Sequence, residues 1–283
     1  MVPIVACSPL LDSASVSLRA LAEFANAAES AGADLLSLRE CDGFDPLSAA
    51  AALVPLTQRI GLCAAATTRY GEPFTLARSF AALDHLSGGR AAWEVLCGPL
   101  PDETARAREH VDVTCQLWES WQADALIFDK PSAIFSDTSK VRRIGHEGAS
   151  FQVRGPLNTP RPPQGCLPLI VTADADESLI NLADLVILDT ASLETALTMR
   201  QRLKAMADKR DGKIALLAVV SHETLARAAW FEKGGCDGFV LQAPLTATRE
   251  LAQMTAALPT GGGPRGGPLR ERLELTPSGG PRP

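Results

Sequence analysis

The chain has 283 residues, of which 46% are apolar and 21% are charged, and its formal net charge at pH 7 is −6. This composition is typical of a globular protein with either two ordinary domains or one large α/β barrel. The acidic balance argues against a nucleic-acid partner, because phosphate binding requires a clustered basic surface.

The first residues, MVPIVACSPLL, contain no basic stretch before their apolar run, and that run is too short to span a bilayer. The seven cysteines form no CxxC pair and show no zinc-ligand spacing. A scattered, odd set of this kind is typical of thiols in a reducing compartment. We therefore predict a cytoplasmic protein with no membrane partner and no metal site.

Apolar, β-rich segments alternate with amphipathic segments along the chain. The predicted strands are residues 4–7, 35–38, 60–66, 91–96, 169–172, 185–188, 214–220 and 239–242. The predicted helices are residues 18–30, 46–58, 74–86, 104–121, 193–209, 223–233 and 246–258. This alternation predicts a parallel (β/α)8 TIM barrel, either complete or lacking part of a unit. Strands as continuously apolar as IALLAVV fit a sheet that is buried on both faces.

Two segments fall outside the alternation. Residues 123–167 contain no clear βα unit, and we predict an excursion packed against the barrel between its fourth and fifth strands, since a structureless loop of that length is unusual. Residues 259–283 carry GGGPRGGP and SGGPRP around LRERLEL, a composition that predicts a flexible tail or an interaction arm. Residues 1–258 are thus predicted to form a single domain.

The segment LDHLSGGR, residues 83–90, runs from the predicted third helix into the fourth strand. It therefore belongs to the amino-terminal end of the strands, the face of such a barrel that contributes to stability. We expect His85 within it to have a structural role, because a lone histidine at a helix end has no partner for catalysis or metal binding.

Polar residues gather at the opposite, carboxyl ends of the predicted strands, where barrels of this kind carry their chemistry. They are Ser8, Arg39, Glu40, Thr67, Thr68, Arg69, Tyr70, Cys97, Thr172, Asp174, Asp176, Asp189, Ser221, His222 and Gln242. Acids at the start of a helix are more often partners of the helix dipole than ligands of a divalent cation, so Asp174, Asp176 and Glu177 predict no metal. No catalytic residue emerges from this set.

Four segments, in the same order, resemble the nitrilotriacetate-monooxygenase-like branch of the bacterial-luciferase superfamily of flavin-dependent monooxygenases. They are GEPFTLARSFAALDHLSGGRAAWEV (71–95), WESWQADALIFDK (118–130), FQVRGPLNTPRPPQG (151–165) and GGCDGF (234–239). The resemblance implies a luciferase-like barrel, reduced FMN as cofactor, a separate NAD(P)H:flavin reductase as partner, and oxidation of a small organic substrate by O2.

The resemblance also implies a homodimer, formed through the helices that follow the second and third strands. The chain is rich in small residues there, with Ala49–Ala52 on one helix and Ala77, Ala81 and Ala82 on the next. Small side chains allow close contact between helices, although they equally allow close packing onto the barrel. We predict a C2 dimer, the commonest closed symmetry.

The resemblance places the flavin ring near the ends of the third and fourth strands. Thr67 stands where relatives carry Ser or Thr, Thr68 where they carry Thr, and Glu40 where they carry Asp, and Trp93 matches a family tryptophan. By this resemblance we predict that these four residues bind the cofactor. The hydrogen-bonding groups at the first three positions predict either contact with the ring or ordinary capping of strand ends. Glu94 replaces the asparagine that follows the tryptophan in relatives.

The phosphate site implied by the resemblance has changed. Relatives carry A-G-S-S after the fifth strand, and this chain carries Ala173, Asp174, Ala175 and Asp176. The Arg-Tyr pair that reaches the phosphate in relatives corresponds to Glu103-Thr104, and the loop before it is reduced to residues 97–101. Two carboxylates beside a phosphate dianion are strongly unfavourable.

Two functions therefore remain open. The first is a two-component flavin-dependent monooxygenase with a degraded FMN-phosphate site, to which FMN binds weakly or not at all. The second is a non-catalytic barrel relative that binds a ligand or a partner protein without turning over flavin.

Overall fold

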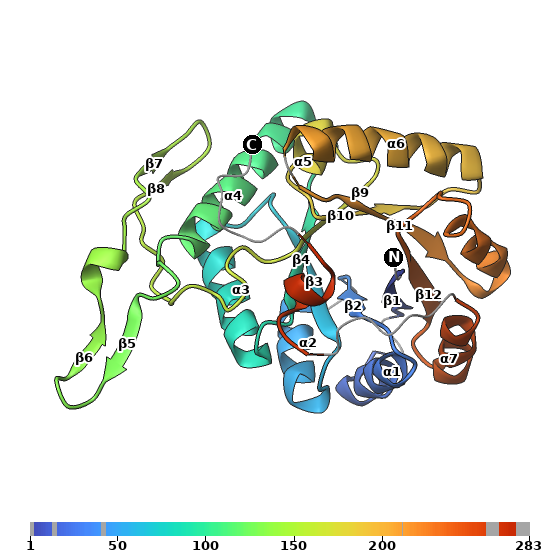
Figure 1. The fold of residues 1–283 in the computed structure, drawn as a ribbon, viewed down its shortest axis with the longest axis horizontal. Coiled ribbons are helices and arrows are strands. Elements are labelled where there is room, and N and C mark those ends of the chain that lie inside the picture. Colours follow the sequence, from blue (N-terminus) through green and yellow to red (C-terminus); the bar gives the residue numbers. More distant parts are fainter. Residues whose placement is uncertain (1–2, 13–15, 41–43, 211, 259–265, 276–283) are drawn as a thin grey trace.

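The computed structural model describes residues 3–12, 16–40, 44–210, 212–258 and 266–275. Its centre is a closed barrel in which parallel strands follow one another in the cyclic order β1, β2, β3, β4, β9, β10, β11, β12 (Figure 1). Their bounds are Ile4–Leu10, Leu35–Leu38, Gly61–Thr67, Ala91–Leu96, Leu169–Thr172, Leu185–Leu188, Ala215–Val220 and Gly238–Pro244. The predicted (β/α)8 barrel is therefore confirmed, and it is complete.

Helices connect the strands and cover the barrel wall. They are α1 (Leu18–Ser30), α2 (Pro46–Leu53), α3 (Pro73–Ser87), α4 (Pro101–Trp118), α5 (Glu177–Ile180), α6 (Leu193–Lys209), the 3-10 helix η3 (His222–Trp230) and α7 (Thr248–Ala256). The predicted second helix continues past Leu53 only as the 3-10 turn Val54–Leu56. None of the helices in the described ranges is both long and apolar enough to cross a membrane.

Local signals in the sequence explain where these helices begin and end. The Asp45 carboxylate accepts a hydrogen bond from the Ser48 amide at 2.7 Å, and Pro46 occupies the first position of α2, where no amide hydrogen is needed. Gly88 ends α3 with φ of 67°, a left-handed conformation that favours glycine. These local interactions are why the predicted helices agree closely with the structure.

Alternation of side chains along the strands produces two apolar layers. One layer fills the interior of the barrel and contains Ile4, Ala6, Leu35, Cys63, Ala92, Ile170, Leu185, Ile187, Leu217 and Val240. The other lies between the strands and the surrounding helices. Because both faces of each strand are covered, the strands are nearly continuously apolar in sequence.

The excursion predicted between the fourth and fifth barrel strands is present. It contains two small antiparallel hairpins, β5–β6 (Leu126–Asp129 and Ile134–Ser136) and β7–β8 (His146–Glu147 and Gln152–Val153). Figure 1 shows both hairpins on the side of α3 and α4, with β5–β6 projecting away from the barrel. Glu109 on α4 accepts hydrogen bonds from the amides of Ser150 and Phe151, each at 2.8 Å, and so fixes the second hairpin.

The LDHLSGGR segment joins this excursion to the amino-terminal end of β4. Asp84 is fully buried, and its carboxylate accepts hydrogen bonds from the Ala91 amide and from the amide and side chain of Gln164. Burial raises the pKa of the Asp84 carboxyl. His85 contacts the Pro160 carbonyl at 3.2 Å. The segment therefore has the structural role that the sequence predicts.

The carboxyl-terminal segment departs from the prediction of a flexible tail. Residues Leu269–Arg272 form α8, a short red helix in Figure 1. Leu269 is fully buried with the residues of the barrel interior. A Cβ atom on Gly61 would lie 2.7 Å from Leu269 Cδ2, so the glycine admits this leucine. The prediction is therefore wrong for residues 266–275, which close the amino-terminal end of the barrel. Residues 259–265 and 276–283 lie outside the described residues.

Candidate functional site

An ion pair between a buried glutamate and a partly exposed arginine lies at the carboxyl-terminal end of the barrel interior. Glu94 on β4 has no exposed side-chain surface, and the guanidinium of Arg39 donates to its two oxygens at 2.5 and 3.2 Å. The hydroxyl of Ser37 on β2 donates to Glu94 Oε2 at 3.0 Å. These charge-assisted hydrogen bonds compensate the buried Glu94 carboxylate, while the Arg39 side chain stays partly exposed to solvent. Sequence reasoning missed this pair, although a charged residue within the apolar strand AAWEVL was the signal.

Asp174 extends this network toward the mouth of the barrel. Burial alone lowers the pKa of the Arg39 guanidinium, but the hydrogen bond and charge of Glu94 outweigh it, and Asp174 adds to them, so the net shift is upward. The charge of Asp174, in the turn after β9, thus acts on the pair of Arg39 with Glu94. Asp174 itself is exposed. An anion that approached Arg39 would meet both carboxylates.

Asp176 caps the start of α5, the short helix after β9. Its carboxylate accepts a hydrogen bond from the Ser178 amide at 2.8 Å, and its carbonyl accepts from the amides of Leu179 and Ile180. The hydrogen bonds from Ser178 lower the pKa of the Asp176 carboxyl, and the nearby charges of Arg108 and Arg202 lower it further. Helix α5 has only four residues, Glu177–Ile180. The amides of Ser178, Leu179 and Ile180 are thus already hydrogen-bonded within the chain.

Ala175 and the two threonines at the end of β3, Thr67 and Thr68, form hydrogen bonds with the backbone. The Ala175 amide donates to the Thr172 carbonyl at 3.0 Å. Thr68 is buried, and its hydroxyl and amide both donate to the Leu96 carbonyl on β4. The exposed Thr67 accepts from the Arg69 amide at 3.1 Å. These hydrogen bonds cap strand ends, and contact of the threonines with a flavin ring stays a prediction.

Trp93 lies away from the mouth, between the barrel wall and helices α3 and α4. Its ring is fully buried and packs against Phe80, His110 and Trp118, with ring centroids 5.6, 5.9 and 6.3 Å away. Its indole nitrogen donates to the Ala66 carbonyl. The sequence prediction that Trp93 binds the cofactor disagrees with this position, because no surface of the ring is accessible. Glu40 is exposed at the mouth and lies next to residues outside the described ranges.

Acidic groups also line the side of the mouth formed by α4. Glu103 forms an ion pair with Arg69 at 2.6 Å and accepts from the Leu100 amide at the start of the helix. Burial raises the pKa of the Cys97 thiol, and the charges of Asp174, Glu103 and Asp176 raise it further. Cys97 is therefore held as a neutral thiol, which makes it a poor nucleophile.

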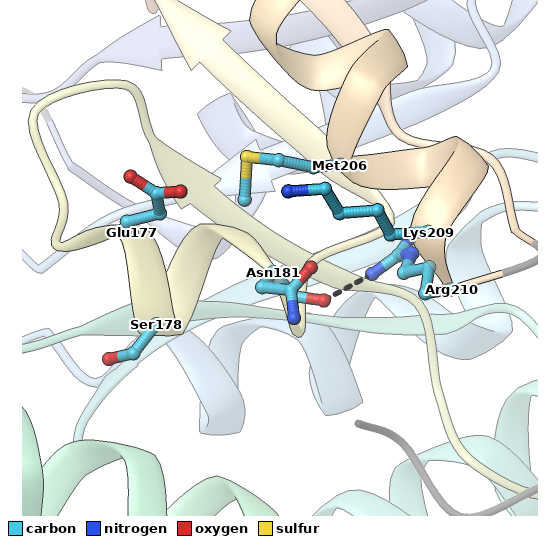
Figure 2. A pocket seen from close by; sticks show the side chains of 6 residues that line it. All are labelled: Glu177, Ser178, Asn181, Met206, Lys209 and Arg210. Atoms are coloured by element: carbon cyan, nitrogen blue, oxygen red, sulfur yellow. Dashed lines mark hydrogen bonds between the residues drawn. The ribbon is translucent and has the colours of Figure 1, made fainter.

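A pocket of about 370 Å³ lies elsewhere, between α5 and the end of α6. Figure 2 shows the side chains that line it, Glu177, Ser178, Asn181, Met206, Lys209 and Arg210. Arg210 is held there by the Asn181 carbonyl, which accepts from its Nη1 at 2.5 Å. Its lining comes from α5, α6 and the residues that end these helices, and not from strand ends. Within the described ranges, no group of three or more His, Cys, Asp and Glu residues is placed to hold a metal ion.

Comparisons with known proteins agree with this architecture. A family model described as luciferase-like monooxygenase matches residues 4–230. The chain is 35% identical over 226 residues to N-acetyl-S-(2-succino)cysteine monooxygenase of Bacillus subtilis (strain 168). The aligned region covers 69% of this chain and 51% of that protein. It is 42% identical over 144 residues to nitrilotriacetate monooxygenase component A of Aminobacter aminovorans, and this aligned region covers 46% of this chain and 32% of that protein. The chain thus spans about half, or less, of the length of these relatives.

Solved structures share the fold at lower sequence identity. EDTA monooxygenase from Chelativorans sp. BNC1 has a TM-score of 0.82 at 19% identity, with 99% of this chain and 100% of that chain covered. A riboflavin lyase has a TM-score of 0.80 at 21% identity, with 96% of each chain covered. The family match over most of the barrel confirms the resemblance inferred from the four sequence segments. The chain belongs to the luciferase-like monooxygenase family.

Proposed function

We propose that the chain is a flavin-dependent monooxygenase of the two-component type whose FMN-phosphate site is degraded. The family supplies the reaction class, in which reduced flavin and O2 oxidise a small organic substrate. The relative from Aminobacter aminovorans is named as component A of its enzyme, which supports a separate NAD(P)H:flavin reductase as partner. The residues after β9 lower the affinity of this member for FMN.

The observation that carries the proposal is the pair of carboxylates, Asp174 and Asp176, in the turn after β9. Asp176 uses its own carboxylate to satisfy the Ser178 amide, and Asp174 faces the ion pair of Arg39 with Glu94. A flavin phosphate carries nearly two negative charges at neutral pH, so it meets repulsion where the fold of a flavin enzyme needs donors. The Glu103 carboxylate adds a further negative charge at the same mouth.

We expect Asp174→Gly combined with Asp176→Ser to tighten FMN binding by at most about thirtyfold, because two carboxylates near a phosphate each cost on the order of 1 kcal/mol in a solvated site. The gain is limited because Glu103 and the short α5 remain. Fluorescence titration of native and variant protein with FMN measures the change. Asp129→Ser with Asp208→Ser removes the same charge from exposed positions away from the mouth and serves as the control. Native protein that purifies with tightly bound FMN contradicts the proposal.

Binding of reduced flavin separates the monooxygenase from the non-catalytic alternative. An anaerobic titration with reduced FMN is expected to reveal binding to the native protein, and addition of O2 and candidate substrates then tests turnover. A chain that binds neither the oxidised nor the reduced flavin, before and after the double substitution, supports instead a barrel that binds a ligand or partner without flavin chemistry.

We further propose that two copies associate through α2 and α3. Ala49, Ala50, Ala77 and Ala81 are buried against the chain's own barrel, which leaves part of the small-residue surface, including the exposed Ala82, for a partner. Light scattering at micromolar concentration is expected to give about twice the chain mass of 29.9 kDa. A mass near that of one chain rejects the dimer.

A further inference from the structure

Two thiols on different elements of the fold are in direct contact. Cys115 lies on α4, and Cys166 lies in the segment that enters β9, with their Sγ atoms 2.8 Å apart. The bonded distance in a disulfide is about 2.05 Å, so the sulfurs need to approach by less than about 1 Å. The two residues are 51 positions apart in the sequence, and the whole excursion lies between them. From this contact we infer that Cys115 and Cys166 form a reversible disulfide under oxidising conditions.

The two sulfurs differ in their access to solvent. Cys115 is partly exposed, whereas Cys166 is only 4% exposed. An oxidant that arrives from solvent therefore reaches Cys115 first, and Cys166 is placed to react with the product. This division between a reacting and a resolving cysteine is typical of thiol pairs that sense oxidants.

With hydrogen peroxide as the oxidant, the reaction balances in two steps. The Cys115 thiolate attacks a peroxide oxygen, the O–O bond breaks, and the departing hydroxide takes a proton to form water, which leaves a sulfenic acid on Cys115. The Cys166 thiolate then attacks the Cys115 sulfur, the S–O bond breaks, and a second water leaves. The two sulfurs are oxidised by two electrons in total, and one peroxide is reduced to two waters.

The position of the bond determines its consequence. It would tie α4 to the residues before β9, and the Cys166 carbonyl already accepts a hydrogen bond from Arg270 Nε at 2.9 Å. The oxidised chain would thus have α4, the start of β9 and the α8 segment linked at one point. A closed loop that encloses the excursion reduces the conformational freedom of the unfolded chain. This inference does not depend on flavin binding or on the proposed monooxygenase activity.

Peptide mapping of the full chain tests the inference. The native protein is treated with a small excess of hydrogen peroxide, the remaining thiols are alkylated after denaturation, and the sample is digested with trypsin. Cleavage at arginine and lysine, except before proline, places Cys115 in residues 109–140 and Cys166 in residues 155–200, each fragment with a single cysteine. We expect one linked species of these two fragments, two hydrogens lighter than their sum, which disappears on reduction.

Three single variants sharpen the result. Cys115→Ser and Cys166→Ser each abolish the linked species, while Cys97→Ser, at another partly exposed cysteine, leaves it unchanged. Oxidation is expected to raise the Tm of the native protein by roughly 5–10 °C and to leave that of Cys115→Ser unchanged. Separate alkylation of both fragments after oxidation, or linkage of Cys115 to a different cysteine, overturns the inference. The native protein alone decides the mapping, even if a variant fails to fold.

Discussion

Replacing Arg270 with methionine is expected to lower the free energy of unfolding by about 3–5 kcal/mol, because removing one member of a buried ion pair leaves the other charge without compensation. Arg270 donates to both oxygens of Asp184, at 3.1 and 2.8 Å, and both side chains are about 95% buried. Its guanidinium also donates to the carbonyls of Cys166 and Leu167. Methionine preserves the apolar stem, so the change mainly removes the charge and its donors.

Urea unfolding followed by circular dichroism measures this effect. Arg202→Met is the matched control, because it removes the same kind of ion pair, with Glu177, from the surface, where the two side chains are 44% and 66% exposed. Exposed pairs contribute less than about 1 kcal/mol. Equal small losses in the two variants would show that the carboxyl-terminal segment does not secure the base of the barrel.

Acidification from pH 6.5 to 4 is expected to remove about 3 kcal/mol of stability through His110 alone, by linkage between protonation and folding. Burial, and secondarily the charge of Arg106, lowers the pKa of His110 from 6.5 to about 4. The unfolded chain therefore binds a proton below pH 6.5 while the folded chain does not. Stability falls as the pH drops through this window and levels off below the folded-state pKa.

His110→Phe isolates this contribution. The imidazole lies edge-on to Trp93 and Phe151, with centroids 5.9 and 5.4 Å away, and a phenyl ring can occupy the same space between them. The difference in unfolding free energy between the native and variant proteins is measured at several pH values between 4 and 7, so that contributions from carboxylates cancel. We expect the variant to gain relative to the native protein as the pH falls.

A pH profile that is parallel for the native protein and His110→Phe would mean that His110 is protonated in the folded state without cost. That result would contradict the burial of the ring within the cluster formed by Trp93, Phe151 and α4. It would leave the barrel architecture untouched.

The elements of this fold could be predicted because the interactions that define them are local. Asp45 before Pro46 and Gly88 after α3 mark helix ends through contacts within a few residues. Apolar runs of four to seven residues mark strands that are buried on both faces. The excursion was predictable for the opposite reason, since residues 123–167 lack either pattern.

The contents of the candidate site could be predicted only in part. The acids after β9 stand out in the sequence, and the structure confirms that Asp176 lies at a helix start. The pair of Arg39 with Glu94 was hidden, because its members are 55 positions apart, on β4 and directly after β2, and meet only when these strands are placed on either side of β3. Trp93 and Glu94 are adjacent in sequence, and only the closed barrel decides that the carboxylate points inward and the indole outward.

The sequence by itself thus determined the order of strands and helices, the family, and the acidic character of the turn after β9, because each depends on residues close together in the chain. The tertiary structure alone decided the closure of the barrel base by α8. The LRERLEL segment is short and surrounded by glycine and proline, so its own propensity predicts little order. Leu269 and Arg270 become ordered because the barrel interior and Asp184 provide apolar contacts and a counter-charge from distant parts of the chain.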